Sequence, residues 1–145
     1  MVAIDTNILV YAHRREAREH DAALQLLRKL AASNHPWAIP WPCVYEFFSV
    51  VTHPKIWKEA ASTPDEAWAQ LESWFGAPTL RLIGEPQGFH LLLEGFLLRS
   101  RVRGPVVHDA RVAAICLAHG VEKLFTRDRD FQLFPELSTE NPFRG

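Results

Sequence analysis

Carboxylate residues follow short apolar runs at three separate places in this chain. Asp5 comes after residues 2–4, Asp109 after residues 105–108, and the pair Asp128 and Asp130 after residues 124–127. Such runs are typical of short buried strands. Because parallel strands of an open α/β sheet place their carboxyl ends at one ligand-binding edge, we expect these carboxylates to meet there. Clustered carboxylates repel one another unless a hard cation neutralises them, so the pattern predicts a divalent-metal enzyme.

Strand-like and helix-like segments alternate along the chain. Strands are expected at residues 2–4, 37–40, 79–83 and 122–126, and helices at residues 8–11, 17–32, 43–51, 64–75, 87–98 and 108–119. The clearest helix start is Thr63-Pro64-Asp65-Glu66, which has the pattern of a capping box with proline in the first turn. The tail after residue 126 is expected to be irregular. This alternation predicts a parallel, doubly wound α/β sheet in one domain over residues 1–145.

Charge and cysteine content narrow the class of protein. The formal net charge of the 145 residues is −1, which excludes a globally basic nucleic-acid-binding protein. Cys43 and Cys116 lie in apolar contexts far apart in the sequence, so we expect free thiols in a reducing compartment. No apolar run reaches transmembrane length and no signal peptide is evident, so we expect a cytoplasmic protein without membrane contacts.

Each acidic candidate also has a plain structural interpretation. Asp5 and Asp109 are ordinary residues for a helix N-terminus, where a carboxylate caps the helix or favours its dipole. Glu46 interrupts the apolar run 43–51 and is either a cleft residue or a glutamate at the helix rim. Asp128 and Asp130, two residues apart, either reach toward one cleft or lie in a solvated loop. Only the order of the four motifs favours a shared site.

Other polar residues near these motifs are candidates for supporting roles. Thr126 has a hydroxyl that can orient an aspartate. Arginine is well suited to phosphate because its planar guanidinium makes paired hydrogen bonds. The candidates for phosphate contacts are Arg14, Arg15, Arg111, Arg127 and Arg129, with an ordinary surface role as the alternative. The histidines show no metal-ligand spacing with cysteine and are expected to be surface or core residues.

Taken together, these motifs resemble those of PIN-domain proteins, in particular the VapC toxins of type II toxin–antitoxin pairs. The matching segments are residues 4–7, Glu46, residues 108–114 and residues 124–131, so the resemblance extends from the first strand to Phe131. It implies a three-layer α/β/α sandwich with a central parallel sheet. It also implies an endoribonuclease that depends on Mg²⁺ or Mn²⁺, is inhibited by a cognate antitoxin, and commonly forms homodimers.

The resemblance also assigns roles to individual residues. Asp5, Glu46, Asp109 and Asp128 match the acidic quartet of the family, while Asn7 and Thr126 match polar positions that support it. Asp130 matches a further acidic position that varies. Asp5 and Asp109 are expected as direct metal ligands, with Glu46 and Asp128 binding through water or at a second metal.

Rival classes fit the sequence less well or remain open. A haloacid dehalogenase-type phosphatase requires a second aspartate at position 7, which is Asn7. A receiver domain requires paired acids after the first strand and a lysine after the last, and both are missing. A metal-free module that binds RNA or protein, and a housekeeping RNA-processing nuclease, both remain open. Trp37, Trp41, Trp57, Phe47 and Phe48 are expected either to form an apolar groove for an antitoxin or to lie in the core.

Overall fold

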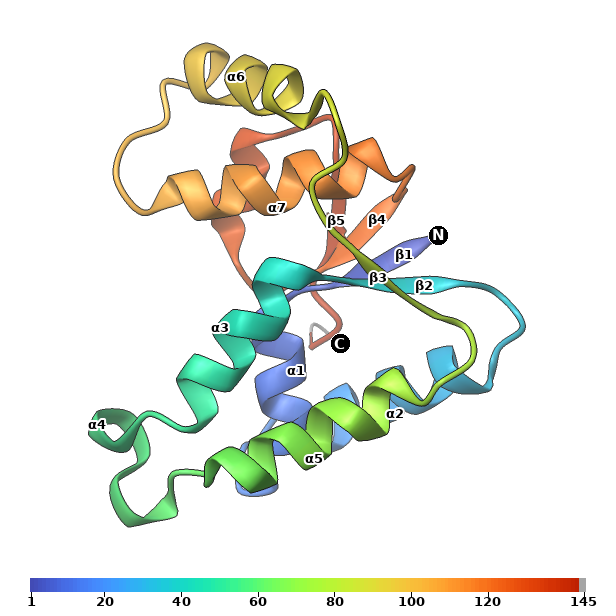
Figure 1. The fold of residues 1–145 in the computed structure, drawn as a ribbon, viewed down its shortest axis with the longest axis vertical. Coiled ribbons are helices and arrows are strands. Elements are labelled where there is room, and N and C mark those ends of the chain that lie inside the picture. The colour runs from blue at the N-terminus through green and yellow to red at the C-terminus, as the bar shows by residue number, and fades with distance from the viewer. Residues whose placement is uncertain (144–145) are drawn as a thin grey trace.

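The computed structural model describes residues 1–143, whose fold is shown in Figure 1. The strands are β1 (Val2–Ile4), β2 (Trp37–Pro40), β3 (Leu80–Ile83), β4 (Lys123–Phe125) and β5 (Ser138–Glu140). The α-helices are α1 (Thr6–His13), α2 (His20–Ala32), α3 (Trp41–Val51), α4 (Pro54–Trp57), α5 (Pro64–Phe75), α6 (Phe89–Arg99) and α7 (Val106–Ala118). Two 3₁₀ helices follow α4 and β4, namely η1 (Lys58–Ala60) and η2 (Arg129–Leu133).

The five strands form one parallel sheet in the order β3-β2-β1-β4-β5. Helices α6 and α7 lie on one side of this sheet, and α1, α2 and α5 lie on the other (Figure 1). The predicted three-layer α/β/α sandwich is therefore confirmed. Strand β1 is central, and the chain builds the sheet first toward β3 and then toward β5. The crevice beside β1 and β4 is thus the topological switch point, where open α/β sheets bind ligands.

The core is built on the apolar strand residues and the helix faces that cover them. Ala3, Ile4, Ile39 and Leu124 are fully buried, as parallel strands covered on both faces require. Trp37 and Phe47 are also fully buried in this core. The core alternative is therefore correct for these two residues, and they cannot line a groove for an antitoxin.

The thiols agree with the sequence-based expectation. Cys43 and Cys116 are buried and free, each on a helix that packs into the core. Within residues 1–143, no helix is long and apolar enough to span a membrane.

Four segments differ from the predicted elements. The run 105–108 is not a strand, because Val106 opens α7. The tail is not irregular throughout, because Ser138–Glu140 forms β5 and pairs in parallel with β4. All three residues of β5 are exposed and polar, so this edge strand carries no apolar signal in the sequence. The short helix α4 was also not predicted, and α2 begins at His20 rather than near residue 17.

Candidate active site

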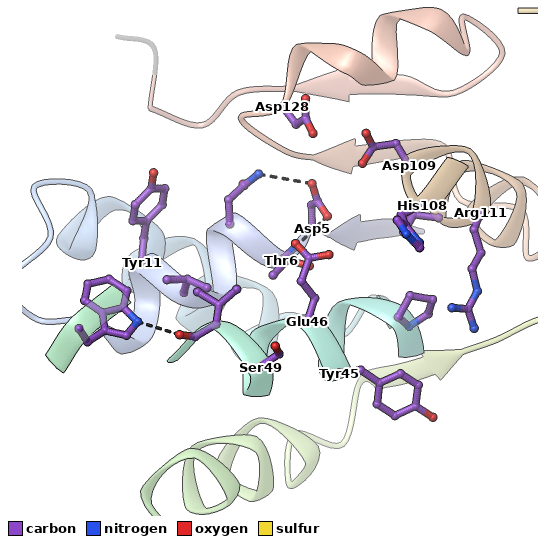
Figure 2. A pocket seen from close by; sticks show the side chains of 16 residues that line it. Asp5, Thr6, Tyr11, Tyr45, Glu46, Ser49, His108, Asp109, Arg111 and Asp128 are labelled. Atoms are coloured by element: carbon purple, nitrogen blue, oxygen red, sulfur yellow. Dashed lines mark hydrogen bonds between the residues drawn. The ribbon is translucent and has the colours of Figure 1, made fainter. Parts of the chain in front are cut away.

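An open pocket of about 630 Å³ lies at the carboxyl end of β1. Its walls come from the start of α1, from α3, from the first turns of α7 and from the loop after β4. All four residues of the predicted acidic quartet line it: Asp5, Glu46, Asp109 and Asp128 (Figure 2). Residues 123 positions apart in the chain are thus brought to one cavity by the parallel sheet and by the N-terminus of α7.

Asp5 is the buried anchor of this pocket. It caps α1, with Oδ1 accepting a hydrogen bond of 2.8 Å from the backbone N–H of Thr6. Its other oxygen, Oδ2, accepts a 2.7 Å hydrogen bond from the hydroxyl of Thr126. Burial raises the pKa of Asp5 above its ordinary value, and the hydrogen bonds from Thr126 and Thr6 oppose this effect. The capping interpretation and the pocket interpretation therefore both hold for the same side chain.

Asn7 and Thr126 connect the end of β1 to the end of β4. The side-chain amide of Asn7 lies 3.4 Å from both Asp5 Oδ2 and Thr126 Oγ1, and its carbonyl oxygen accepts from the backbone N–H of Arg127 at 3.2 Å. The hydroxyl of Thr126 in turn accepts from the backbone N–H of Asp128 at 3.0 Å. This network fixes two carboxylates, Asp5 and Asp128, relative to one another, which is the positioning that a metal or phosphate site needs.

Asp128 also belongs, with Asp109 and Asp130, to the tightest acidic group among residues 1–143. Oxygens of Asp109, Asp128 and Asp130 all lie within 4.8 Å of one another. Desolvation, together with the nearby charges of Asp128 and Asp5, raises the pKa of Asp109 to about 7. Asp128 also caps η2, because its Oδ1 accepts from the backbone N–H of Asp130 at 2.8 Å. Asp109 is not a cap, because α7 begins at Val106 after Pro105.

Glu46 faces this group from α3, on another wall of the pocket (Figure 2). The residue is exposed, yet partial desolvation of its carboxyl group in the pocket and the charge of Asp5 raise its pKa. His108 has the opposite effect on that pKa. Glu46 does not belong to the 4.8 Å group, so the pocket separates a compact aspartate cluster from a single opposing glutamate.

The comparisons with known proteins agree with this geometry. No protein-family model matches the chain. Ribonuclease VapC48 of Mycobacterium tuberculosis is 30% identical over 141 residues, covering 97% of each chain. A VapC ribonuclease of Mycobacterium bovis, Mb2897, is 30% identical over 145 residues, covering 100% of this chain and 97% of the relative. The chain belongs to the VapC ribonuclease family.

Solved structures share the fold of this VapC-family chain. VapBC2 from Rickettsia felis, bound to a DNA fragment from its promoter, has a TM-score of 0.70 at 21% identity and covers 97% of this chain and 98% of its own. VapC20 of Mycobacterium tuberculosis, described as a sarcin-ricin loop cleaving toxin, has a TM-score of 0.68 at 15% identity, with coverages of 91% and 93%. At these identities the likeness concerns the fold alone, which is the PIN-domain architecture.

The arginine candidates of the VapC-family chain differ in how free they are. Arg14 is buried: it pairs with Glu16, donates to the carbonyl of Ala60 at 2.8 Å, and lies outside the acidic pocket. These contacts occupy Arg14 and argue against the predicted phosphate contact. Arg127 pairs with Glu19 and donates to the hydroxyl of Tyr11.

The other three arginine candidates also differ in their surroundings. Arg111 lines the pocket and is paired with Glu85 through two hydrogen bonds of 3.1 and 3.2 Å. Arg15 and Arg129 are exposed, and Arg129 lines a smaller adjoining pocket with Asp128. Arg111, Arg127 and Arg129 therefore stay the candidates next to the acidic cluster.

Several pocket residues were not identified from the sequence. They are Thr6, Val10, Tyr11, Tyr45, His108 and Val112. His108 directly precedes Asp109, and Tyr45 directly precedes Glu46, so adjacency to a predicted carboxylate was the one available signal. His108 has no cysteine at the spacing of a metal-ligand pair, so a histidine–cysteine pattern could not indicate its place in the pocket.

Proposed function

We infer that this VapC-family protein is an endoribonuclease and the toxin of a type II toxin–antitoxin pair. The observation that carries this inference is the acidic pocket, in which Asp5, Glu46, Asp109 and Asp128 line one open cavity at the switch point of the sheet. The curated relatives, which match this chain over almost their whole length, are named ribonucleases. Phosphodiester hydrolysis is the chemistry that clustered carboxylates and a divalent cation perform together.

The donor set of the pocket fits a hard divalent cation, and we propose Mg²⁺, with Mn²⁺ as a substitute. All the candidate ligand atoms in the acidic group are carboxylate oxygens, which Mg²⁺ prefers. Burial, together with the charges of neighbouring carboxylates, raises the pKa of Asp109, and a cation held beside it would oppose both effects. Asp109, Asp128 and Asp130 would hold the metal, with Asp5 and Glu46 as further carboxylates of the same pocket.

When bound, the metal supplies an activated water and stabilises the charge that develops on the scissile phosphate. The residues of the chain have separate tasks. The Thr126 hydroxyl and the Thr6 backbone N–H hold the Asp5 carboxylate in one orientation. Glu46 borders the opposite wall and limits where an RNA strand can pass. Arg111 offers a guanidinium to a substrate phosphate if its pair with Glu85 opens.

We propose two protein partners for this chain. The first is a cognate antitoxin, which is supported by fold neighbours described as VapBC and other toxin–antitoxin complexes. The second is another copy of the chain in a homodimer. Leu91 and Leu98 on α6 are 65% and 68% exposed, and apolar side chains this accessible are suited to protein contacts.

The test of the catalytic proposal is RNA cleavage by purified, antitoxin-free protein. A mixed pool of structured RNAs is incubated with Mg²⁺, with Mn²⁺ and with EDTA, using wild-type protein and the variant Asp109→Asn. We expect cutting that needs a metal and is lost in Asp109→Asn. The matched control is Asp21→Asn, because Asp21 is exposed on α2 and does not line the pocket.

Other outcomes separate the remaining alternatives. Full activity of Asp109→Asn would remove the acidic pocket as the active site. Metal binding without cutting would indicate a selective substrate that is missing from the pool. If the protein neither binds metal nor cleaves RNA, the metal-free binding module is the better description. Growth arrest on expression, relieved by a co-encoded small protein, would distinguish a toxin from a housekeeping RNA-processing nuclease.

A further inference from the structure

Three aromatic rings line the acidic pocket, and two of them are already engaged. The hydroxyl of Tyr11 accepts a 2.9 Å hydrogen bond from Arg127, whose guanidinium lies 5.7 Å from the ring centroid. The indole N–H of Trp57 donates to the carbonyl of Val50 at 2.8 Å, and the guanidinium of Arg14 lies 4.0 Å from the centroid of that ring. Both side chains are therefore held within the wall of the pocket.

The third ring, Tyr45, is available. It is 61% exposed, although it lines the pocket and directly precedes Glu46 on α3. One face stacks on Trp41, with ring centroids 6.0 Å apart and an interplanar angle of 28°. Trp41 is packed in turn against Phe75 of α5, with a centroid distance of 6.2 Å. Tyr45 is thus an exposed ring that packs on Trp41, and Trp41 is held in turn by Phe75.

The position of Tyr45 on α3 places this ring beside the path of a substrate. Pro42, Tyr45, Glu46 and Ser49 all line the pocket from α3, so one side of the helix forms a continuous wall. In Figure 2, Tyr45 and Ser49 lie on opposite sides of Glu46 along this wall. The Tyr45 ring therefore borders the same cavity as the four carboxylates.

We propose that Tyr45, supported by Trp41, is a stacking platform for an unpaired base of the RNA substrate next to the cleaved bond. This proposal rests on the proposed function and adds to it a residue that binds a base beside the cleaved bond. A supported aromatic ring binds a base through its π-face, and proteins read single-stranded RNA largely by such stacking. A base held inside a duplex has both faces covered by its neighbours and cannot use the platform.

The choice of RNA over another protein follows from the surroundings of the ring. Tyr45 is continuous with the pocket that would hold the scissile phosphate, and its neighbour in sequence and on the pocket wall is a carboxylate, Glu46. A neutral base can lie against the ring while its phosphate is held at the cation site. Because Trp41 and Phe75 hold the ring in place, stacking on it does not require a large loss of side-chain freedom.

Binding of short fluorescent oligoribonucleotides, measured by anisotropy, tests the platform. Every protein carries Asp109→Asn, so that the RNA stays intact, and every sample contains the same concentration of Mg²⁺, which screens the remaining carboxylates. The variants are Tyr45→Ala and Tyr45→Phe, with Ile56→Ala as a control because Ile56 is 53% exposed on α4 and does not line the pocket. We expect Tyr45→Ala to weaken single-stranded binding roughly tenfold or more, and Tyr45→Phe and Ile56→Ala to leave it nearly unchanged.

The same assay includes a duplex of the same sequence, and sedimentation gives the mass of each variant. Equal loss of duplex and single-strand affinity, or no loss in Tyr45→Ala, overturns the proposal. A change of oligomeric mass in Tyr45→Ala also overturns it, because the ring would then serve contact between two copies of the chain. The readout is binding, so it is separate from the nuclease. If RNA binding depends on Tyr45 but the protein without Asp109→Asn neither binds metal nor cuts RNA, the proposed function fails and the platform stands.

Discussion

At the scale of single residues, the Thr126 hydroxyl is the group that most directly orders the site. It donates to the buried oxygen of Asp5 at 2.7 Å and accepts from the backbone N–H of Asp128 at 3.0 Å. One side chain therefore positions two carboxylates that belong to different parts of the chain. Its place directly after β4 was readable from the sequence, but its two partners were not.

We predict that Thr126→Val will lower both stability and activity. Valine keeps the volume of threonine but leaves the Asp5 carboxylate and the Asp128 N–H without this partner, which costs about 1–3 kcal/mol. Cleavage should fall roughly tenfold or more because an orienting group is lost. Urea unfolding and initial cleavage rates measure the two effects. Thr126→Ser should recover most of both, and Thr139→Val, at an exposed position of β5, should change neither.

The raised pKa of Asp109 predicts how the stability of the metal-free protein depends on pH. In the unfolded chain this carboxyl has a pKa near 3.8, and in the folded protein it is raised to about 7. Between these values the folded protein binds more protons than the unfolded chain, so the free energy of unfolding falls as the pH rises. Asp5 and Glu46, whose pKa values are also raised, act in the same direction.

The measurement is the unfolding midpoint in EDTA at several pH values between about 4 and about 8. We expect the midpoint of the wild type to fall across this range, and the midpoint of Asp109→Asn to fall less. The difference between the two midpoints should level off above about pH 7, where Asp109 is ionised in both the folded and the unfolded protein. Parallel pH profiles for the two proteins would show that the pKa of Asp109 is not raised in the folded protein.

At the scale of elements, helix α3 carries Glu46 and is held in place by α5. Phe47 of α3 packs edge-on against Trp74 of α5, with ring centroids 5.0 Å apart, and both residues are buried. The start of α5 is a complete capping box, in which Thr63 and Glu66 exchange hydrogen bonds of 3.1 and 2.9 Å. This was the clearest helix start in the sequence, and the structure confirms it.

We predict that Thr63→Ala will lower the free energy of unfolding by about 1 kcal/mol, because it removes the cap of α5. Cleavage at temperatures well below unfolding should be unchanged, since Thr63 is exposed and lies outside the acidic pocket. Urea unfolding measures the loss. Ser73→Ala, at an exposed position inside α5, is the control and should be close to neutral. Loss of activity without loss of stability would mean that this cap has a direct role at the site.

The elements that the sequence predicted are those with strong local signals. The apolar runs before Asp5 and Thr126 became β1 and β4, and the apolar periodicity of residues 17–32 became α2. The failures have physical causes as well. Strand β5 is polar and exposed at the sheet edge, so only pairing with β4 defines it. The run at 105–108 is as apolar as a strand, but it begins α7.

At the scale of the whole molecule, the site exists only when four separate parts of the chain are packed together. Its carboxylates come from the end of β1, from α3, from α7 and from the loop after β4. An unfolded chain cannot assemble this set. A cation that binds it should therefore stabilise the folded protein by mass action.

We predict that saturating Mn²⁺ or Mg²⁺ will raise the unfolding midpoint of the wild type, and that EDTA will reverse the effect. At a metal concentration of about one hundred times the dissociation constant, the gain is about 2.7 kcal/mol. Asp128→Asn should show little of this shift, because Asp128 belongs to the 4.8 Å group. Calorimetric or fluorescence melting curves measure it. An equal shift in Asp128→Asn would place the cation elsewhere on the protein.

The sequence by itself determined which side chains can do the chemistry and where the chain turns from strand to helix, because both depend on residue type and local spacing. It was sufficient to place Asp5, Glu46, Asp109 and Asp128 in the family pattern. The tertiary structure alone decided which of them are neighbours. It groups Asp130 with Asp109 and Asp128, sets Glu46 on another wall, and turns Arg14 toward Glu16. These distances depend on how α7 and the loop after β4 pack against the sheet, and no local pattern encodes that packing.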